Sequence, residues 1–183
     1  MKRVMALALA LVFALPATSA FADTVTVDNT AVTFIPEDER TLPKSEKIIS
    51  FDVTYTTGPD ELVDARTGRR CRTGGIEVAA RNSVGVMYKF GTDARGCRRN
   101  GKIVSVDWRT PYGWTAWWTT WSYIQNDTHI EAKGGTIGES SYVWRQWRGH
   151  MENCVTWYCP DRYPWIYLGF RADGTVGRNG DAG

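Results

Sequence analysis

The stretch Tyr163-Pro164-Trp165-Ile166-Tyr167-Leu168-Gly169-Phe170-Arg171 alternates between two kinds of side chain. One set is a complete apolar face, made of Pro164, Ile166, Leu168 and Phe170. The other set is aromatic and polar, and consists of Tyr163, Trp165, Tyr167, Gly169 and Arg171. Because successive side chains of a β-strand point to opposite faces, Trp165 and Tyr167 cannot share the core that Ile166 fills. We therefore predict a strand that packs on one face and presents aromatic rings to a second layer, an interface or a ligand on the other.

The same period of two recurs along the chain, while sustained helical periodicity is scarce. Alternating apolar residues occur in the segments 49–55, 76–81, 84–90 and 104–108. Turn-forming residues separate the apolar runs, at Gly58-Pro59-Asp60, Asn100-Gly101, Gly134-Gly135 and Asp173-Gly174. Many short strands between turns are typical of antiparallel proteins. We predict an all-β fold, a single-domain antiparallel β-sandwich or barrel over residues 23–176, braced by two disulfides.

Two segments are expected to depart from this pattern. Asp60 and Gly68 stand where the N-cap and the C-cap of a short helix would stand, which predicts one helical turn between them. The glycine-rich residues 177–183 predict a flexible C-terminal tail.

Residues 1–22 have the features of an export signal of bacterial type. Lys2 and Arg3 supply positive charge, residues 4–15 are apolar, and Ala20-Phe21-Ala22 fits a cleavage site. The apolar run is shorter than the roughly 20 residues that a spanning helix needs. No second hydrophobic span follows in the sequence. We therefore predict a signal peptide that is removed on export, and a secreted product.

The four cysteines are Cys71, Cys97, Cys154 and Cys159. An even number of cysteines in an oxidising compartment predicts two disulfides, and three pairings are possible. Residues 75–81 and 84–90 resemble a hairpin centred near Asn82-Ser83, which would bring Cys71 beside Cys97. This favours the pairs Cys71–Cys97 and Cys154–Cys159. The spacing does not fit a thiolate zinc site, so we predict no metal.

Charge is balanced in total but segregated along the chain. The net charge of +2 comes from 22 basic and 20 acidic residues, and removal of Lys2 and Arg3 leaves 20 of each. A neutral domain has no electrostatic basis for binding nucleic acid. Residues 23–64 hold ten acids and three bases, whereas residues 66–109 hold eleven bases and three acids. We expect the two segments to neutralise each other in the fold, with an anion-binding patch as the alternative.

All nine tryptophans lie between Trp108 and Trp165. A buried tryptophan needs a partner for its indole N–H, and a domain of this size has few such interior positions. We therefore expect a subset to be exposed. Trp108 alternates with Val104 and Val106, so we assign it to the core.

Residues 117–124 form a second aromatic segment. If they form one strand, Trp117, Trp121 and Tyr123 share a face, although the pattern does not say which face points inward. A row of rings on one face could bind a ligand. We predict as ligand-binding residues Trp117, Trp121, Trp165 and Tyr167.

No established catalytic motif is present in the sequence. Asp127, His129 and Glu131 would project from one face of a strand and could ligate a metal or transfer protons. We favour the simpler interpretation, the polar face of an antiparallel strand, and the pair His150 and Glu152 has the same ambiguity. We predict no cofactor and assign no catalytic residue.

These observations predict a secreted module that binds rather than catalyses. The leading hypothesis is carbohydrate or cell-wall binding, since sugar rings stack on aromatic rings while edge groups meet their hydroxyls. The alternative is a secreted inhibitor or antagonistic toxin that presents the same rings to a protein target. A small secreted hydrolase ranks third, because two catalytic carboxylates can come from distant strands. The expected partner is an extracellular polysaccharide, a cell-wall glycan or a secreted protein, and not nucleic acid.

Overall fold

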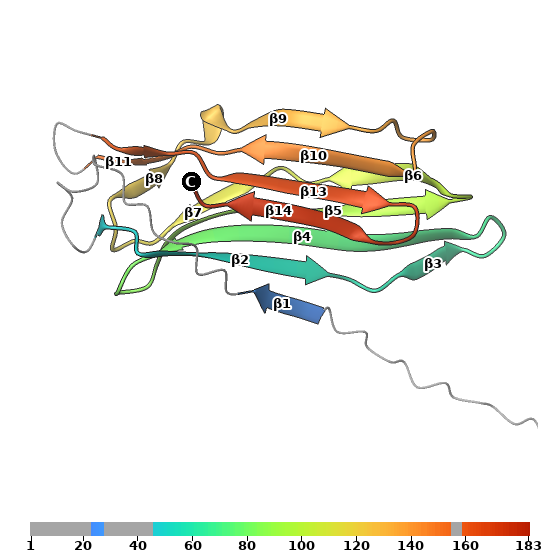
Figure 1. Cartoon of the computed structure of the whole chain (residues 1–183), viewed down its shortest axis with the longest axis horizontal. Helices are drawn as coiled ribbons and strands as arrows, with labels where there is room; N and C mark the ends of the chain where they lie inside the picture. The colour runs from blue at the N-terminus through green and yellow to red at the C-terminus, as the bar shows by residue number, and fades with distance from the viewer. Residues whose placement is uncertain (1–22, 28–45, 155–158) are drawn as a thin grey trace, which may run out of the picture.

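The computed structural model describes residues 23–27, 46–154 and 159–183, and its regular structure is almost entirely β-strand (Figure 1). The largest sheet is antiparallel with the strand order β1-β2-β4-β5-β6, and β3 and β7 pair with β4 and β5. Its strands are β1 (Asp23–Val27), β2 (Ser50–Thr57), β3 (Glu61–Asp64), β4 (Arg69–Arg81), β5 (Val86–Arg99), β6 (Lys102–Trp108) and β7 (Tyr112–Thr115).

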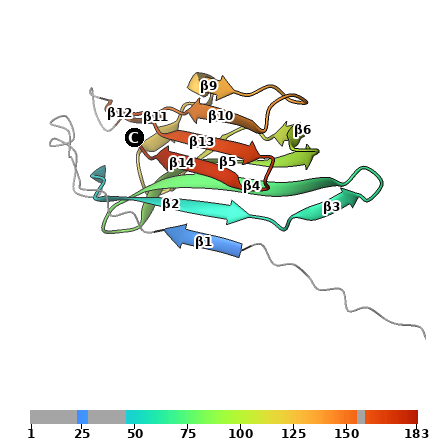
Figure 2. The ribbon, with the colours of Figure 1, turned by 45° about the vertical axis from the view of Figure 1, so that its right-hand side comes forward.

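Two smaller antiparallel sheets complete the domain, one of four strands in the order β14-β13-β10-β9 and one of three in the order β12-β11-β8. Their elements are β8 (Trp121–Tyr123), the 3-10 helix η3 (Gln125–Asp127), β9 (His129–Gly134), β10 (Tyr142–Arg148), β11 (Met151–Asn153), β12 (Asp161–Arg162), β13 (Trp165–Arg171) and β14 (Val176–Asp181). Strands β13 and β14 lie across β4 and β5, so the two larger sheets form a β-sandwich (Figures 1 and 2). The predicted all-β antiparallel fold is confirmed.

The core fills the space between these two sheets. The larger sheet contributes alternating buried residues of β4 and β5, among them Ile76, Val78, Ala80, Tyr88 and Phe90. The four-stranded sheet contributes Val143, Trp147, Ile166, Leu168 and Phe170. The period of two in the sequence therefore predicts correctly which face of each strand is apolar.

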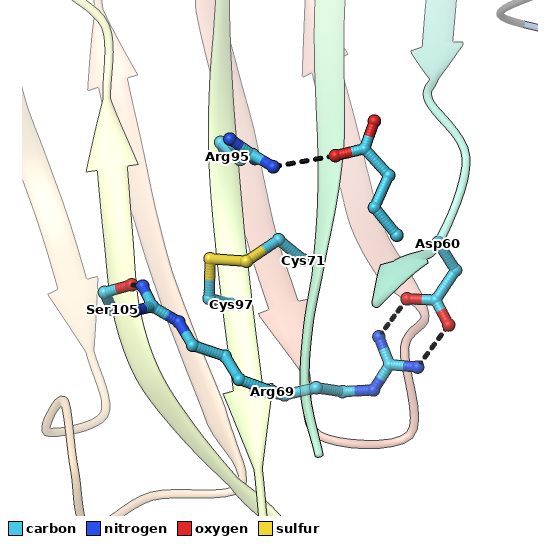
Figure 3. The surroundings of a disulfide bond; sticks show 8 residues. Asp60, Arg69, Cys71, Arg95, Cys97 and Ser105 are labelled. Atoms are coloured by element: carbon cyan, nitrogen blue, oxygen red, sulfur yellow. Dashed lines mark hydrogen bonds and ion pairs between the residues drawn. A yellow bond between two sulfur atoms is a disulfide. The ribbon is translucent and has the colours of Figure 1, made fainter. Parts of the chain in front are cut away.

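Strands β4 and β5 form the hairpin that the sequence predicts. Buried Asn82 closes its turn, because its side-chain oxygen accepts the N–H groups of Val84 and Gly85 at 2.8 and 3.0 Å. The register places Cys71 directly opposite Cys97, and the two form a disulfide (Figure 3). The second disulfide joins Cys154 and Cys159. Both predicted pairings are confirmed.

Acidic side chains neutralise arginines around the first disulfide, as the charge pattern predicts (Figure 3). Asp60 pairs with Arg98 at 2.5 Å and with Arg70 at 2.6 Å, and Glu61 pairs with Arg95 at 2.7 Å. The hydrogen bond from Arg98 is the main cause that lowers the pKa of Asp60. Burial opposes this effect and Arg70 adds to it, which leaves the pKa at about 2.

The helix predicted between Asp60 and Gly68 is wrong. Residues Glu61–Asp64 form the edge strand β3, which pairs with the start of β4. Asp60 does not cap a helix because its carboxylate binds the two arginines. Asp64 instead accepts the N–H groups that follow it, which closes a turn, and Gly68 has a φ of 66° that this turn requires.

The flexible tail predicted for residues 177–183 is also wrong. These residues include most of β14, and Ala182 is fully buried. The Tyr88 hydroxyl donates to the Ala182 carbonyl at 2.8 Å. Glycine allows β14 to approach the core closely, since a Cβ on Gly180 would lie 2.9 Å from a methyl carbon of Val78. Gly180 is therefore a packing position, and Val176–Asp181 form a strand that pairs with β13.

The predicted signal peptide, residues 1–22, lies outside the described residues. Within the part that the structure describes, no helix is long and apolar enough to cross a membrane. Two disulfides in a β-sandwich fit an extracellular protein.

Candidate functional site

Strand β13 has the two faces that its sequence predicts. Ile166, Leu168 and Phe170 are buried between the sheets. Trp165 and Tyr167 alternate with them on the outer face of the four-stranded sheet, where both are partly exposed. These two rings therefore lie outside the core, in a position where a ligand can reach them.

The register of β10 against β13 adds two more rings to this outer face. Trp144 stands opposite Gly169, and Gln146 stands opposite Tyr167. The ring centroids of Trp144 and Tyr167 are 5.2 Å apart, at an interplanar angle of 41°. The hydroxyls of Tyr142 and Tyr167 form a hydrogen bond. We call this set the aromatic face and define it as Tyr142, Trp144, Trp165 and Tyr167.

Three glycines make room for the rings of the aromatic face. Gly134, Gly169 and Gly177 share one register row with Trp144, across all four strands of the sheet. A Cβ on Gly134 would lie 2.5 Å from the indole nitrogen of Trp144, and a Cβ on Gly177 would lie 2.7 Å from the Tyr142 hydroxyl. The rings of Tyr142 and Trp144 therefore lie directly against the backbone of neighbouring strands.

Polar groups border the aromatic face. The guanidinium of Arg171 lies over the Tyr142 ring, 4.4 Å from its centroid. Glu131 accepts a hydrogen bond from Gln146 at 2.8 Å and pairs with Arg148 at 2.8 Å. N–H donors and carboxylate oxygens thus stand beside apolar ring surface.

The Tyr167 hydroxyl stays protonated at physiological pH. Burial raises the pKa of Tyr167 above its ordinary value, and the hydrogen bond with Tyr142 raises it further. A neutral phenol can both donate and accept a hydrogen bond, so it suits a ligand with hydroxyl groups.

The structure separates the two tryptophans that were predicted to share a site. Trp117 is 94% exposed in the turn after β7, whereas Trp121 is 2% exposed in the core. The prediction that Trp121 meets a ligand is therefore wrong. The Thr119 N–H donates to the Ala116 carbonyl and closes a turn, so residues 117–124 are not one strand and their alternation has no common phase.

Trp108 packs against the core, as the sequence predicts. Its ring centroid lies 5.4 Å from that of buried Trp147 and 5.9 Å from that of Phe170. Trp108 and Trp147, two of the nine tryptophans, are therefore packing residues at the edge of the sandwich.

Asp127, His129 and Glu131 do not converge on one centre. Asp127 ends η3, and the ring nitrogen Nδ1 of His129 contacts the Asp127 backbone carbonyl at 2.8 Å. Glu131 turns instead to Gln146 and Arg148 on β10. The favoured interpretation, a polar strand face, fits the exposed positions of His129 and Glu131 on β9.

An Asp–His–Asp cluster forms around the other histidine. His150 contacts Asp127 at 2.7 Å and Asp161 at 2.8 Å, and its ring stacks on Tyr163 at a centroid distance of 4.9 Å. Burial lowers the pKa of His150, but the hydrogen bonds and charges of Asp161 and Asp127 outweigh burial, so the pKa is raised. His150 therefore joins η3 to β12, and the two carboxylates favour its protonated form.

Tyr142 and Trp144 are candidate site residues that sequence reasoning missed. The signal is visible in residues 142–148, where Val143 and Trp147 are buried and Tyr142 and Trp144 occupy the alternate positions, on the opposite face of the strand. Gly134, Gly169 and Gly177 resemble turn residues in the sequence. Their packing against the aromatic rings depends on the register of the strands, which only the fold shows.

No protein-family model matches this chain, and no curated protein or solved structure is significantly similar to it. The chemistry of the site therefore follows from its own geometry. An aromatic surface with hydrogen-bonding groups at its border can hold a ligand that has an apolar face and many hydroxyls.

Proposed function

We propose that the aromatic face binds carbohydrate, and that the protein is a secreted, non-catalytic module for a polysaccharide or cell-wall glycan. One observation carries this proposal. Trp144 and Tyr167 lie ring beside ring, partly exposed, on a stretch of sheet where glycines replace the neighbouring side chains.

Sugar chemistry fits this surface in two ways. A pyranose ring has a face of C–H groups, and stacking that face on an indole or a phenol removes apolar area from water. The hydroxyls at the sugar edge would meet the border of the aromatic face, where Arg171 and Gln146 supply N–H donors.

The expected affinity for one sugar is low. An aromatic contact contributes about 0.5–1.5 kcal/mol beyond the area that it buries, so a few rings hold a single sugar weakly. Contacts repeated along a polymer add through multivalency. We therefore expect retention on insoluble polysaccharide to be a better measure than binding of monosaccharides.

The test of this proposal is retention on insoluble polysaccharides such as cellulose, chitin and purified cell wall. The double variant Trp165→Ala/Tyr167→Ala should lose retention while its near-ultraviolet circular dichroism shows an intact fold. Trp117→Ala is the matched control, because it removes a more exposed indole outside the aromatic face. Equal retention of the double variant and the unaltered protein would exclude the aromatic face as the binding surface.

A second candidate function, binding of a protein target, is favoured by a different group of rings. Tyr112 and Trp114 on β7 are 45% and 46% exposed, and Trp117 follows them in the next turn. Exposed tryptophan and tyrosine are typical of binding hot spots between proteins. Recovery of a stoichiometric protein partner from culture supernatant would support the inhibitor hypothesis if Trp117→Ala abolishes its capture. Trp117→Ala then serves as the test of protein binding, as well as the control for polysaccharide retention.

A further inference from the structure

A pocket with aromatic walls lies on the side of the four-stranded sheet opposite the aromatic face, where the ends of β6 and β8 meet β9 and β10. It has a volume of about 310 Å³. The rings of Trp108, Tyr123 and Trp147 form part of its wall. Such a volume is at the lower end of the range for small-molecule sites and accommodates a single ring.

Arg145 brings a positive charge into this pocket. Its register partner on β13 is buried Leu168, so the Arg145 side chain is on the inward face of β10. The guanidinium lies over the Trp108 ring, 5.0 Å from its centroid. Partial burial lowers the pKa of Arg145, which reflects the cost of keeping this charge away from water.

No carboxylate compensates this charge in the described part of the chain. Arg148 and Arg98, by contrast, have acidic partners at 2.8 and 2.5 Å. The residue opposite Arg145 on β9 is Lys133, which has the same sign of charge. A partly buried guanidinium without an anion is costly, and a bound anion would remove that cost.

The rest of the pocket also favours an anion. Among the residues that the structure describes, none of those lining the pocket is Asp or Glu. Arg109, Gln125, Thr128 and His129 contribute N–H and O–H groups to its wall. Arg109 already pairs with Asp93 at 3.0 Å outside the pocket, so Arg145 is the main source of uncompensated charge.

We propose that this pocket binds the carboxylate of a small ring-bearing acid. Arg145 pairs with the carboxylate, and the ring of the ligand packs against Trp108, Trp147 and Tyr123. The ligand ring belongs either to a sugar acid, such as a hexuronate, or to an aromatic acid. This site is separate from the aromatic face, since Arg145 and Trp144 point to opposite sides of β10.

The test is a nuclear magnetic resonance titration of the full chain with sodium glucuronate and, separately, with sodium benzoate. Glucose and benzyl alcohol are the neutral counterparts. At least one acid should shift the indole N–H signals of Trp108 and Trp147, and its neutral counterpart should bind roughly tenfold more weakly or worse. The acid that binds identifies the source of the ring. Failure of both acids, or equal binding of acid and neutral counterpart, would overturn the proposal.

Variants locate the carboxylate. Arg145→Gln should weaken binding of the acid roughly tenfold or more, while Arg145→Lys, which keeps the charge, should bind better than Arg145→Gln. Arg171→Gln is the matched control, because Arg171 also lies over a ring but on the outer face. Loss of binding in Arg171→Gln with full binding in Arg145→Gln would refute the site. If Arg145→Gln does not fold, the comparison of each acid with its neutral counterpart in the unaltered protein still tests whether the pocket requires a carboxylate.

The same titration separates this proposal from carbohydrate binding by the aromatic face. Trp144→Ala should lose retention on polysaccharide and keep binding of the acid. Loss of acid binding in Trp144→Ala would contradict a separate pocket, whatever the outcome of the retention experiment.

Discussion

The indole of Trp144 on β10 lies against Gly134 on β9, where a methyl group would come within 2.5 Å of the indole nitrogen. Gly169 on β13 stands on the other side of Trp144 in the same register row. The orientation of this ring therefore depends on two neighbouring strands that carry no side chain beside it.

The variant Gly134→Ala should weaken retention on polysaccharide several-fold, because the new methyl group must push the Trp144 ring away. Stability should change little, since the displaced group is the indole of a partly exposed side chain outside the core. Gly85→Ala is a suitable control, because its Cβ would only touch Trp118 at 3.8 Å. Unchanged retention in Gly134→Ala, measured beside this control, would show that the glycine does not shape the binding surface.

Trp121 and Trp117 should differ sharply in their effect on stability. Trp121→Ala removes a core ring that packs on Tyr88 at a centroid distance of 5.2 Å, and should cost about 3–5 kcal/mol. Trp117→Ala should stay within about 0.5 kcal/mol of the unaltered protein. Urea unfolding measures both values. Similar values for the two variants would contradict the turn that separates them.

Asp60→Asn should lower stability at neutral pH and have little effect at strongly acidic pH. The pKa of Asp60 is lowered from 3.8 to about 2 in the fold. Its stabilising contribution is therefore present above the unfolded value and is lost as the pH falls toward the folded value. Allowing for solvent screening of its arginine pairs, we expect a loss of about 1 kcal/mol near pH 7. Urea unfolding at both pH values checks this, and an equal loss at both would exclude the ion pairs as its cause.

His150→Gln should show the opposite pH dependence. Because the pKa of His150 is raised by Asp161 and Asp127 against the effect of burial, protonated His150 stabilises the fold. That contribution is fully present below the ordinary pKa of histidine and disappears as the pH rises through the raised value. The difference in unfolding temperature between the unaltered protein and His150→Gln should thus be largest in mild acid. A difference that grows toward alkaline pH would contradict a charged His150.

The alternation of side chains predicted most of the sandwich because burial on one face imposes a period of two. It identified β13 and assigned Ile166 to the core and Trp165 to the outer face, and the hairpin geometry gave the pair Cys71–Cys97. These features depend on neighbours along one strand or across one turn, so a single sequence contains enough information to predict them.

The failures have a common physical cause, which is tertiary context overriding a local signal. In the sequence, Asp60 resembles a helix cap, but in the fold its carboxylate pairs with Arg98. In the sequence, Gly180 resembles a flexible residue, but in the fold it leaves space for Val78 to pack beside it. The turn closed by Thr119 interrupts the alternation between Trp117 and Trp121, so the two side chains do not share a face. The spacing of residues alone does not show this turn.

Only part of the candidate site could be predicted from the sequence, because the other part depends on pairing between distant strands. Trp165 and Tyr167 belong to the strand whose alternation is clearest. Tyr142 and Trp144 join them only through the register of β10 against β13, and the cluster around His150 assembles from segments separated along the chain. Long-range pairing of this kind is not encoded in the spacing of residues.

Oxidation footprinting in the presence of bound polysaccharide shows which aromatic rings the glycan covers. Trp144, Trp165 and Tyr167 are partly exposed and should be oxidised in the free protein, whereas Trp117 should be oxidised with or without ligand. If the aromatic face binds glycan, polysaccharide protects Trp144, Trp165 and Tyr167 and leaves Trp117 reactive. Protection of Trp117 with undiminished oxidation of Trp144 would place the ligand elsewhere and exclude the aromatic face as the binding surface.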